Sequence, residues 1–227
     1  MTQDAGKFRA ALDAAFVRDN DPTALVFDNY LRWKGSPAFL VRPIYPADAA
    51  PADMLVSPHF TVLAYQANPL YTTLCTLGAS YGVIPSSTVS FGDERGVRYE
   101  YIMHTPPDAA QPIAGLLALI AEHPFEHQVE IGPGYILPIG EPVIPGSPME
   151  FLYFTYPYLD DGRLYEANPW GQIEQAELLI QTLWVFPIYL AEAEFIRTSG
   201  VEAFEERLQE HHSQKYDAYD FMRLPIV

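Results

Sequence analysis

The sequence is short of cysteine, of positive charge and of long apolar runs. Its single cysteine, Cys75, excludes a disulfide within the chain, and the apolar run at 74–77 around it predicts a buried, unreactive thiol. No stretch is long enough to span a bilayer, and residues 1–7 lack the basic and apolar segments of a signal peptide. We therefore expect a cytoplasmic protein that binds no membrane.

Basic side chains are outnumbered in this chain. Its 13 lysines and arginines face 29 aspartates and glutamates, which gives a formal net charge of −16 at pH 7. Such a field repels nucleic acid and anionic lipid, and it steers a basic protein towards the surface. The same excess also keeps a globular protein soluble, and net charge identifies no site. Nucleic acid is therefore not an expected partner, whereas a basic protein fits.

Motifs for cofactors and metals are absent or interrupted. No G-x-x-x-x-G-K-[ST] or G-x-G-x-x-G pattern occurs, so no phosphate-binding loop is indicated. His123 and His127 are four residues apart beside Glu122 and Glu126, a spacing that presents two imidazoles to one metal on a continuous helix. Pro124 lies between them and favours a helix end, so we interpret both as surface or capping histidines. We expect no cofactor.

The composition favours an α+β fold. Of the 227 residues, 49% are hydrophobic, and 21 prolines against 14 glycines indicate many short strands and rigid loops. Hairpin signals dominate, and helices are interspersed without strict alternation. No repeat or long linker divides the chain, so we expect one domain over residues 1–227. The predicted sheet is mixed, mostly antiparallel and packed with helices.

Residues 178–186 are the stretch around which the chain is predicted to be organised. They form an almost unbroken apolar run of strand length, so a buried strand is expected. Pro187 closes the run, where it could occupy the first turn of a following helix. Apolar residues then recur at spacings of three and four from Ile188 to Phe195, and Gly200 supplies a stop.

Shorter patterns predict the remaining elements. A turn signal at 66–69 is expected to join two strands as a hairpin. Strands are predicted at 38–45, 60–65, 70–77, 98–105, 135–139 and 149–156. Helices are predicted at 8–16, 113–120 and about 201–212.

A serine motif supports an alternative, enzymatic interpretation. Gly-Ala-Ser-Tyr-Gly at 78–82 matches the G-x-S-x-G nucleophile elbow and follows a predicted strand. An elbow must open a helix, and Pro85 stands where that helix would have to continue. A serine hydrolase that uses Ser80 nevertheless remains the alternative. Its triad would need Asp160 or Asp161 and His211 or His212.

Clusters of acidic residues are the candidate partner-binding sites. Two pairs stand out, Asp93 with Glu94 and Asp160 with Asp161, and a third group lies within the last predicted helix. Such clusters are either solvated faces or a docking surface for a basic partner. The candidate partner-binding residues are Asp93, Glu94, Asp160 and Asp161. The third group comprises Glu202, Glu205, Glu206 and Glu210.

Four segments, in their order along the chain, resemble the suppressor of fused family. They are Thr-Leu-Gly-Ala-Ser at 76–80, Arg-Tyr-Glu-Tyr-Ile-Met at 98–103, Gly-Tyr-Ile at 134–136 with Pro-Gly-Ser at 145–147, and Trp-Val-Phe-Pro-Ile at 184–188 with Glu192 and Gly200. The second is similar to the family's Arg-x-Glu-Leu strand, although Tyr101 stands where an aliphatic residue is usual.

The resemblance is to the N-terminal type of domain and to stand-alone bacterial members, and it implies binding instead of catalysis. The animal protein sequesters a transcription factor, and bacterial members resemble immunity proteins that neutralise toxins. In the family the stretch around Ser80 is a structural strand end. We therefore expect a non-catalytic, protein-binding domain that acts as an immunity protein for a basic toxin. An adaptor role is the further alternative, and the oligomeric state is left open.

Overall fold

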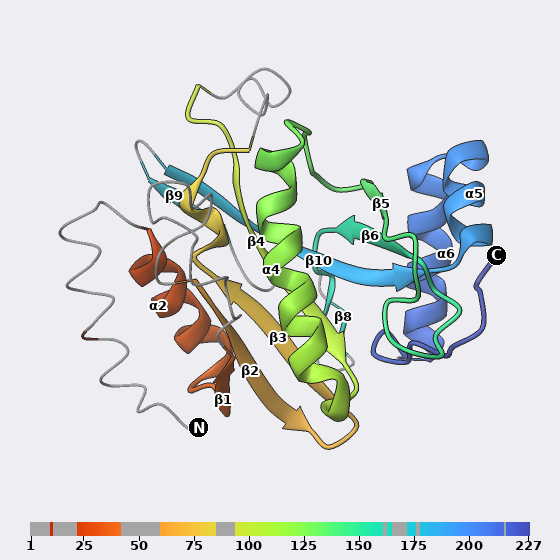
Figure 1. The fold of residues 1–227 in the computed structure, drawn as a ribbon, viewed down its shortest axis with the longest axis horizontal. Helices are drawn as coiled ribbons and strands as arrows, with labels where there is room; N and C mark the ends of the chain where they lie inside the picture. Colours follow the sequence, from red (N-terminus) through yellow and green to blue (C-terminus); the bar gives the residue numbers. More distant parts are fainter. Residues whose placement is uncertain are drawn as a thin grey trace.

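A mixed β-sheet forms the middle of the molecule (Figure 1). The computed structural model describes residues 10, 22–41, 60–84, 94–160, 163–164, 172–175, 178–215 and 217–227. The sheet strands are β1 (Phe39–Val41), β2 (Thr61–Asn68), β3 (Tyr71–Leu77), β4 (Arg98–Thr105), β5 (Ile136–Pro138), β6 (Phe151–Thr155), β9 (Ile173–Gln175) and β10 (Leu178–Ile188). A separate pair is formed by β7 (Leu159–Asp160) and β8 (Arg163–Leu164).

The sheet has the order β1-β2-β3-β4-β10-β6-β5, with β9 also paired to β10. Neighbouring strands run antiparallel, except that β4 and β10 are parallel. The central strand β10 contacts β4, β6 and β9, which makes it the hub of the sheet. This architecture confirms the predicted α+β class with a mixed, mostly antiparallel sheet.

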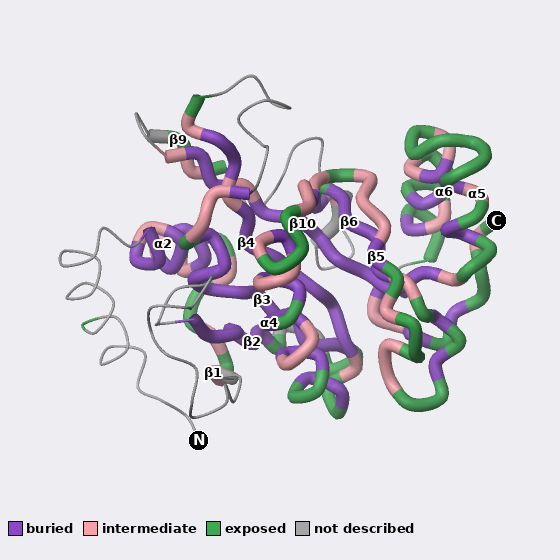
Figure 2. The backbone as a smooth tube through the Cα atoms, turned by 45° about the horizontal axis from the view of Figure 1, so that its top comes forward, coloured by how far each residue is buried: buried purple, intermediate pink, exposed green. Residues whose placement is uncertain are grey.

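Helices cover both faces of the sheet and bury it. They are α2 (Thr23–Lys34), α4 (Ala110–Glu126), α5 (Leu190–Ser199) and α6 (Val201–Gln214). Helix α4 packs on one face, where Ile113 and Leu117 join a core with Leu183 of β10. Helices α2, α5 and α6 pack on the other face, around Trp184 and Phe186. Figure 2 shows the central strands buried along most of their length.

The central strand was predicted correctly, but its end was not. Pro187 lies inside β10 instead of the first turn of the next helix, which begins at Leu190 with Tyr189 as its N-cap. The parallel pairing with β4 ends at Trp184, whereas β6 follows β10 as far as Ile188. Proline is tolerated there because that part of the strand lacks a neighbour on the β4 side.

Two other predicted boundaries shift. Strand β2 continues through Asn68, so the hairpin turn is shorter than the 66–69 stretch and lies at Pro69 and Leu70. Helix α4 continues two residues past Pro124, at which we expected it to end. A proline in the last turn removes only one hydrogen bond of the helix ladder, so the helix tolerates it.

Helix α2 was not predicted. Its buried residues Val26, Phe27 and Tyr30 follow the three- and four-residue spacing of a helix, a signal that the sequence contains. The helix predicted at 8–16, apart from Ala10, and residues 42–45 of the strand predicted at 38–45 lie outside the described residues. Within the described part of the chain, no helix combines the length and the apolar character needed to cross a bilayer.

Candidate functional site

Glu100, in the middle of β4, is completely buried and accepts five hydrogen bonds from one short stretch of chain. Its Oε1 accepts from the backbone nitrogens of Gly78 and Ser80, each at 3.0 Å, and from the Ser80 hydroxyl at 2.7 Å. Its Oε2 accepts from the Thr76 hydroxyl at 2.6 Å and from the Ala79 nitrogen at 3.3 Å. Burial raises the pKa of Glu100, and these hydrogen bonds act in the opposite direction.

Arg98 holds the same turn from the same strand. Two residues apart on β4, Arg98 and Glu100 point to the same face of the sheet. The Arg98 guanidinium donates to the carbonyl of Ser80 at 3.2 Å and also to the carbonyl of Tyr81. Gly78 has a φ of 100°, which suits glycine because it has no Cβ. The Arg-x-Glu strand and the Gly-Ala-Ser turn therefore form one structural unit.

Ser80 does not have the surroundings of a catalytic nucleophile. It is completely buried, and its hydroxyl donates to a carboxylate instead of an imidazole. The chain after β3 forms only the three-residue 3-10 helix Ala79–Tyr81, not the helix that an elbow requires. The triad candidates His211 and His212 lie in α6. The structure therefore brings none of the described triad candidates to this serine.

His211 and His212 belong to a different cluster at the end of α6. His212 is buried, its ring lies 5.5 Å from that of Trp184, and its Nδ1 is 3.1 Å from the Tyr158 hydroxyl. His211 Nε2 lies 2.9 Å from Oδ1 of the buried Asp217. Burial lowers the pKa of His212 to about 3, so this imidazole is neutral at pH 7. The cluster fastens the chain that follows α6 against the sheet.

A second buried carboxylate, Glu192, forms an ion pair with Arg223. Arg223 donates to it through both guanidinium ends, at 2.7 Å and 3.0 Å, and the two side chains are 2% and 0% exposed. Glu192 also accepts from the backbone nitrogens of Tyr189 at 2.8 Å and Ile226 at 3.0 Å. Arg223 reaches the Pro187 carbonyl at 3.3 Å. This pair holds residues 217–227 against the start of α5.

The role of Arg223 was missed by the sequence reasoning. Glu192 stands at the third position of α5, which is the acidic position of a capping box and a readable signal. Nothing in the local pattern around Arg223 indicates a buried arginine, since its neighbours Met222 and Leu224 are apolar.

His123 and His127 lie side by side at the end of α4. Their ring centroids are 4.5 Å apart, and His127 is the C-cap, donating from its backbone nitrogen to the His123 carbonyl. Burial lowers the pKa of His123, and the neighbouring His127 adds to this effect. Among the described residues, no group of three or more histidine, cysteine, aspartate or glutamate side chains is arranged to hold a metal ion.

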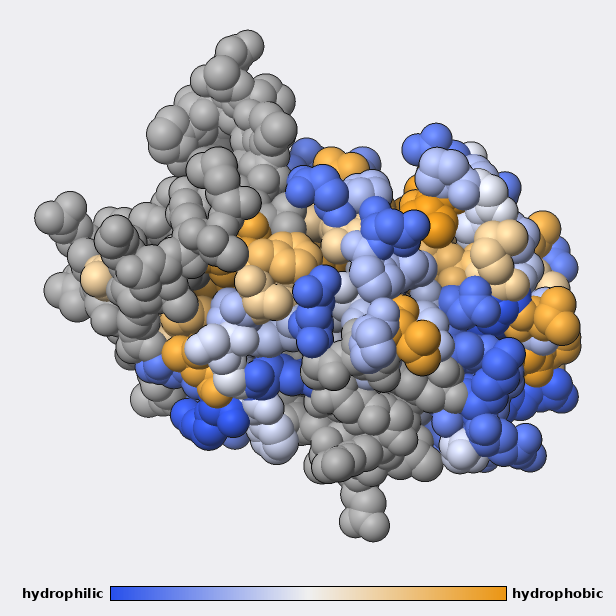
Figure 3. All heavy atoms as spheres, turned by 90° about the horizontal axis from the view of Figure 1, so that it is seen from below, coloured by the Kyte–Doolittle hydropathy of each residue, from blue (hydrophilic) through white to orange (hydrophobic). Residues whose placement is uncertain are grey.

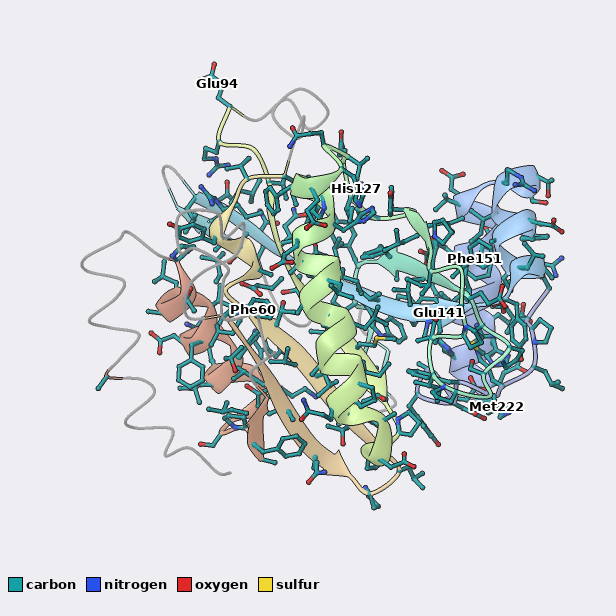
Figure 4. The ribbon with its side chains drawn as sticks, viewed as in Figure 1. Phe60, Glu94, His127, Glu141, Phe151 and Met222 are labelled. Carbon is teal, nitrogen blue, oxygen red and sulfur yellow. The ribbon has the colours of Figure 1, made fainter. Side chains whose placement is uncertain are left out.

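The four candidate partner-binding residues do not form one described surface. Glu94 is exposed at the outer end of the segment before β4 (Figure 4). Asp160 lies in the β7–β8 pair, in register with Arg163. Asp93 and Asp161 lie outside the described residues. Their role as a binding site stays a prediction.

The acidic residues of α6 divide into two kinds. Glu202, Glu206 and Glu210 are exposed to solvent. Glu205 is half-buried and accepts a 2.6 Å hydrogen bond from the buried Tyr153 hydroxyl. Burial raises the pKa of Glu205, against the effect of its hydrogen bonds. One member of this group therefore supports the fold, and three remain available to a partner.

Negative charge is concentrated in one long stretch of the chain. Between Arg98 and Arg197 the sequence has 14 aspartates and glutamates and a single basic residue, Arg163. This stretch runs from β4 through α4 and β6 to α5, so it supplies both faces of the sheet. Glu100 and Glu192 are buried and satisfied, whereas the exposed acids among the described residues of the stretch give the domain a negative exterior: Asp108, Glu126, Glu141, Glu150, Glu174 and Glu194.

The turn after β3, the Arg-x-Glu segment of β4 and the junction of β10 and α5 all lie in the part of the chain that matches a known protein family. The sequence profile of the suppressor of fused protein matches residues 56–223. The chain belongs to the suppressor of fused family. The match spans β2 to the segment after α6, so it includes both buried carboxylates. A comparison with curated protein sequences gives no match.

Solved structures show the same fold. The crystal structure of a putative suppressor of fused homologue from Neisseria gonorrhoeae is 17% identical with a TM-score of 0.64, and the alignment covers 92% of this chain and 98% of that chain. The structure of a Sufu–Fu complex is 12% identical with a TM-score of 0.58, covering 91% of this chain and 92% of that chain. At these identities the likeness establishes the fold.

Proposed function

We propose that this suppressor of fused domain is a non-catalytic protein-binding domain that sequesters a basic protein. In its sharpest form the partner is a toxin and the domain acts as an immunity protein in the cytoplasm, without a cofactor. The binding unit is one domain over residues 1–227, with its core at about 25–210.

The observation that carries the proposal is the one-sided charge of a rigid scaffold. Between Arg98 and Arg197 a single basic residue accompanies 14 acidic ones, and the two deepest carboxylates are neutralised or hydrogen-bonded inside the fold. The remaining acids create a negative field that attracts a basic macromolecule and accelerates its association. The structure of a Sufu–Fu complex supports protein binding as an activity of a related domain.

The contact residues in this proposal are Glu94 and Asp160, with Asp93 and Asp161 beside them. Glu94 is exposed, and its neighbour Arg95 forms a 2.9 Å ion pair with Glu174 across to β9. That pair engages the cation next to Glu94 in the sequence and leaves the Glu94 carboxylate to an outside partner.

A binding measurement with a basic nuclease toxin encoded beside this gene tests the proposal. We expect a complex whose Kd rises steeply between 50 and about 500 mM salt, because screening shortens the reach of exposed charge. The toxin should also stop cell growth, and co-expression of this protein should restore it. Absence of a complex, or a salt-independent Kd, contradicts the proposal.

Charge-reversal variants separate contact from steering. Glu94→Lys/Asp160→Lys and the control Glu141→Lys/Glu150→Lys change the net charge equally, and Glu141 and Glu150 are exposed elsewhere. A slower association common to both pairs reports the overall field. A faster dissociation limited to Glu94→Lys/Asp160→Lys supports the proposed contact, and equal dissociation rates would remove these residues from it.

A further inference from the structure

Residues 217–227, which we call the tail, bury an arginine and expose two large apolar side chains. Phe221 and Arg223 are 1% and 4% exposed, whereas Met222 and Leu224 between and after them are 60% and 80% exposed. Phe221 and Met222 are the central residues of a turn that the Arg223 nitrogen closes on the Asp220 carbonyl at 3.2 Å, and their side chains leave this turn in different directions. The inward side of the tail therefore contains an arginine, and its outward side presents two large apolar side chains.

Several hydrogen bonds determine this register. The Ser147 hydroxyl donates to the Phe221 carbonyl at 2.7 Å, and the Ile226 nitrogen donates to Glu192 at 3.0 Å. Arg223 adds its two-pronged bond to Glu192, and its own carbonyl accepts from the Tyr189 hydroxyl. A shift by one residue would break all of these bonds at once.

This register stabilises the fold less than one that buries the apolar side chains of the tail would. Removing a guanidinium and a carboxylate from water carries a large desolvation penalty, which an apolar pair of similar volume avoids. Exposing Met222 and Leu224 forgoes the stabilisation that their burial would provide. Departures from local design rules of this kind are expected at functional sites. Apolar side chains held outward by a buried ion pair are an arrangement for contact with another molecule.

A cleft lies beside the tail. It has a volume of about 370 Å³ and is lined by Arg207, Glu210, His211 and Gln214 of α6 and by Ile226 of the tail. Arg207 is occupied by Phe195, whose ring centroid lies 4.6 Å from its guanidinium carbon. Glu210 is exposed and can face a cation in this cleft. Figure 3 shows apolar atoms gathered among hydrophilic ones at this end of the molecule.

Acidic groups accompany the apolar ones. Asp220 accepts a 2.9 Å hydrogen bond from the Met222 nitrogen, so a carboxylate lies directly beside the exposed methionine. Glu206 on α6 is exposed as well, whereas the exposed Glu194 on α5 lies 3.8 Å from the Arg197 guanidinium. A partner that covers Met222 therefore has to bring positive charge near its apolar contact.

We propose that the outward side of the tail, Met222, Leu224 and Val227, together with the cleft beside Ile226, docks a protein segment that carries aliphatic side chains next to lysine or arginine. A second copy of this chain does not fit, because each copy carries a net charge of −16 and would bring acid to acid. The inference rests on the proposed protein-binding function and adds an apolar contact surface to the acidic contacts proposed for it.

Random 12-residue peptides displayed on phage provide the probe. Peptides selected on the wild-type protein are synthesised, and their Kd values are measured by fluorescence anisotropy against Met222→Ser/Leu224→Ser and against a matched control, Leu70→Ser/Leu119→Ser. The control replaces two leucines that are 60% and 66% exposed, far from the tail in sequence. Both variants should keep their melting temperature within about 2 °C of wild type, because the replaced side chains are exposed.

We expect the selected peptides to combine aliphatic and basic residues. Their Kd should rise at least about tenfold for Met222→Ser/Leu224→Ser and stay within about twofold for the control. Equal weakening by both variants, peptides without basic residues, or no selected peptide at all would overturn the docking surface. Toxin binding that persists with full affinity in Met222→Ser/Leu224→Ser overturns this inference alone, whereas a wild-type protein that binds no basic protein overturns the proposed function.

Discussion

Glu100 and Glu192 are both completely buried carboxylates, and the fold satisfies them in opposite ways. Glu100 accepts five hydrogen bonds from uncharged donors, all within residues 76–80. Glu192 binds a guanidinium that lies 31 residues further along the chain. The donors to Glu100 lie in the turn beside its own strand. Glu192 obtains its charged partner only when the tail packs against α5.

Glu100 therefore stabilises the sheet itself, whereas Glu192 links the tail to the rest of the domain. The donors around Glu100 come from the end of β3, which pairs directly with β4, so they are in place once these strands pair. The Glu192 site is complete only when Arg223 is bound, so it couples the tail to α5. Removing the Glu100 acceptor should destabilise the whole domain. Removing the Glu192–Arg223 ion pair should release the tail.

The largest effect is expected from Glu100→Leu. It leaves the buried backbone nitrogens of Gly78, Ala79 and Ser80 without an acceptor, which should cost about 5 kcal/mol of unfolding free energy, comparable with the whole stability of many domains. Urea denaturation measures the loss. In Glu100→Gln the amide oxygen can replace Oε1, so about 2 kcal/mol is expected. Equal losses for the two variants would show that the donors do not depend on this acceptor.

Arg223→Met should be next in size. It leaves Glu192 buried without its charged partner, at a cost of about 3–5 kcal/mol, and hydrogen exchange at the Ile226 amide should accelerate as the tail is released. The double variant Glu192→Met/Arg223→Leu removes both charges, so it should lose less stability than Arg223→Met, and what it still loses reflects the Tyr189 and Ile226 nitrogens left without their acceptor. A single variant as stable as the double one would contradict the coupling of tail and domain.

His212 shows a third solution, a titratable ring kept neutral by burial beside Asp217 and Tyr158. Its pKa in the folded protein is about 3, against about 6.5 in an unfolded chain. The stabilisation is therefore present above pH 6.5 and is lost as the pH falls towards 3, by about 2 kcal/mol between pH 7 and 5. His212→Phe should flatten this part of the stability profile by that amount. Leu119→Ser, which replaces an exposed side chain that does not titrate, should keep the wild-type profile, and equal profiles for all three proteins would contradict the prediction.

The smallest effect is expected from Ser80→Ala. It removes one of five hydrogen bonds to Glu100, so the loss of unfolding free energy should be about 1 kcal/mol by urea denaturation. The same variant tests the alternative interpretation as a serine hydrolase. If purified wild-type protein hydrolyses a model ester and Ser80→Ala abolishes that turnover, the binding interpretation of this domain is wrong.

Several elements could be predicted because their signals are local. The apolar run at 178–186 and the Gly200 stop are read directly from neighbouring residues, and β10 and α5 follow them. Helix α2 carries a similar signal in Val26, Phe27 and Tyr30, which was overlooked. The position of Pro187 was wrong because its tolerance depends on where β4 leaves β10, a property of pairing between distant strands.

The candidate site was less predictable than the fold. Acidity marked Glu94 and Asp160 as candidates, but acidity does not say which carboxylates face outward. Glu205 was grouped with the exposed acids of α6, and the structure turns it towards Tyr153. Whether a helical carboxylate meets solvent or a buried hydroxyl depends on the strand that packs beneath it.

The sequence by itself determined the α+β class, the hub strand, the negative exterior and the family, because apolar period, turn residues and charge are properties of short stretches. Only the tertiary structure decided that Ser80 faces Glu100 across 20 residues, and that Arg223 points inward while Met222 and Leu224 point outward. Which side of a strand or tail is buried depends on partners that folding brings together from distant parts of the chain. These partners cannot be predicted from the local sequence pattern.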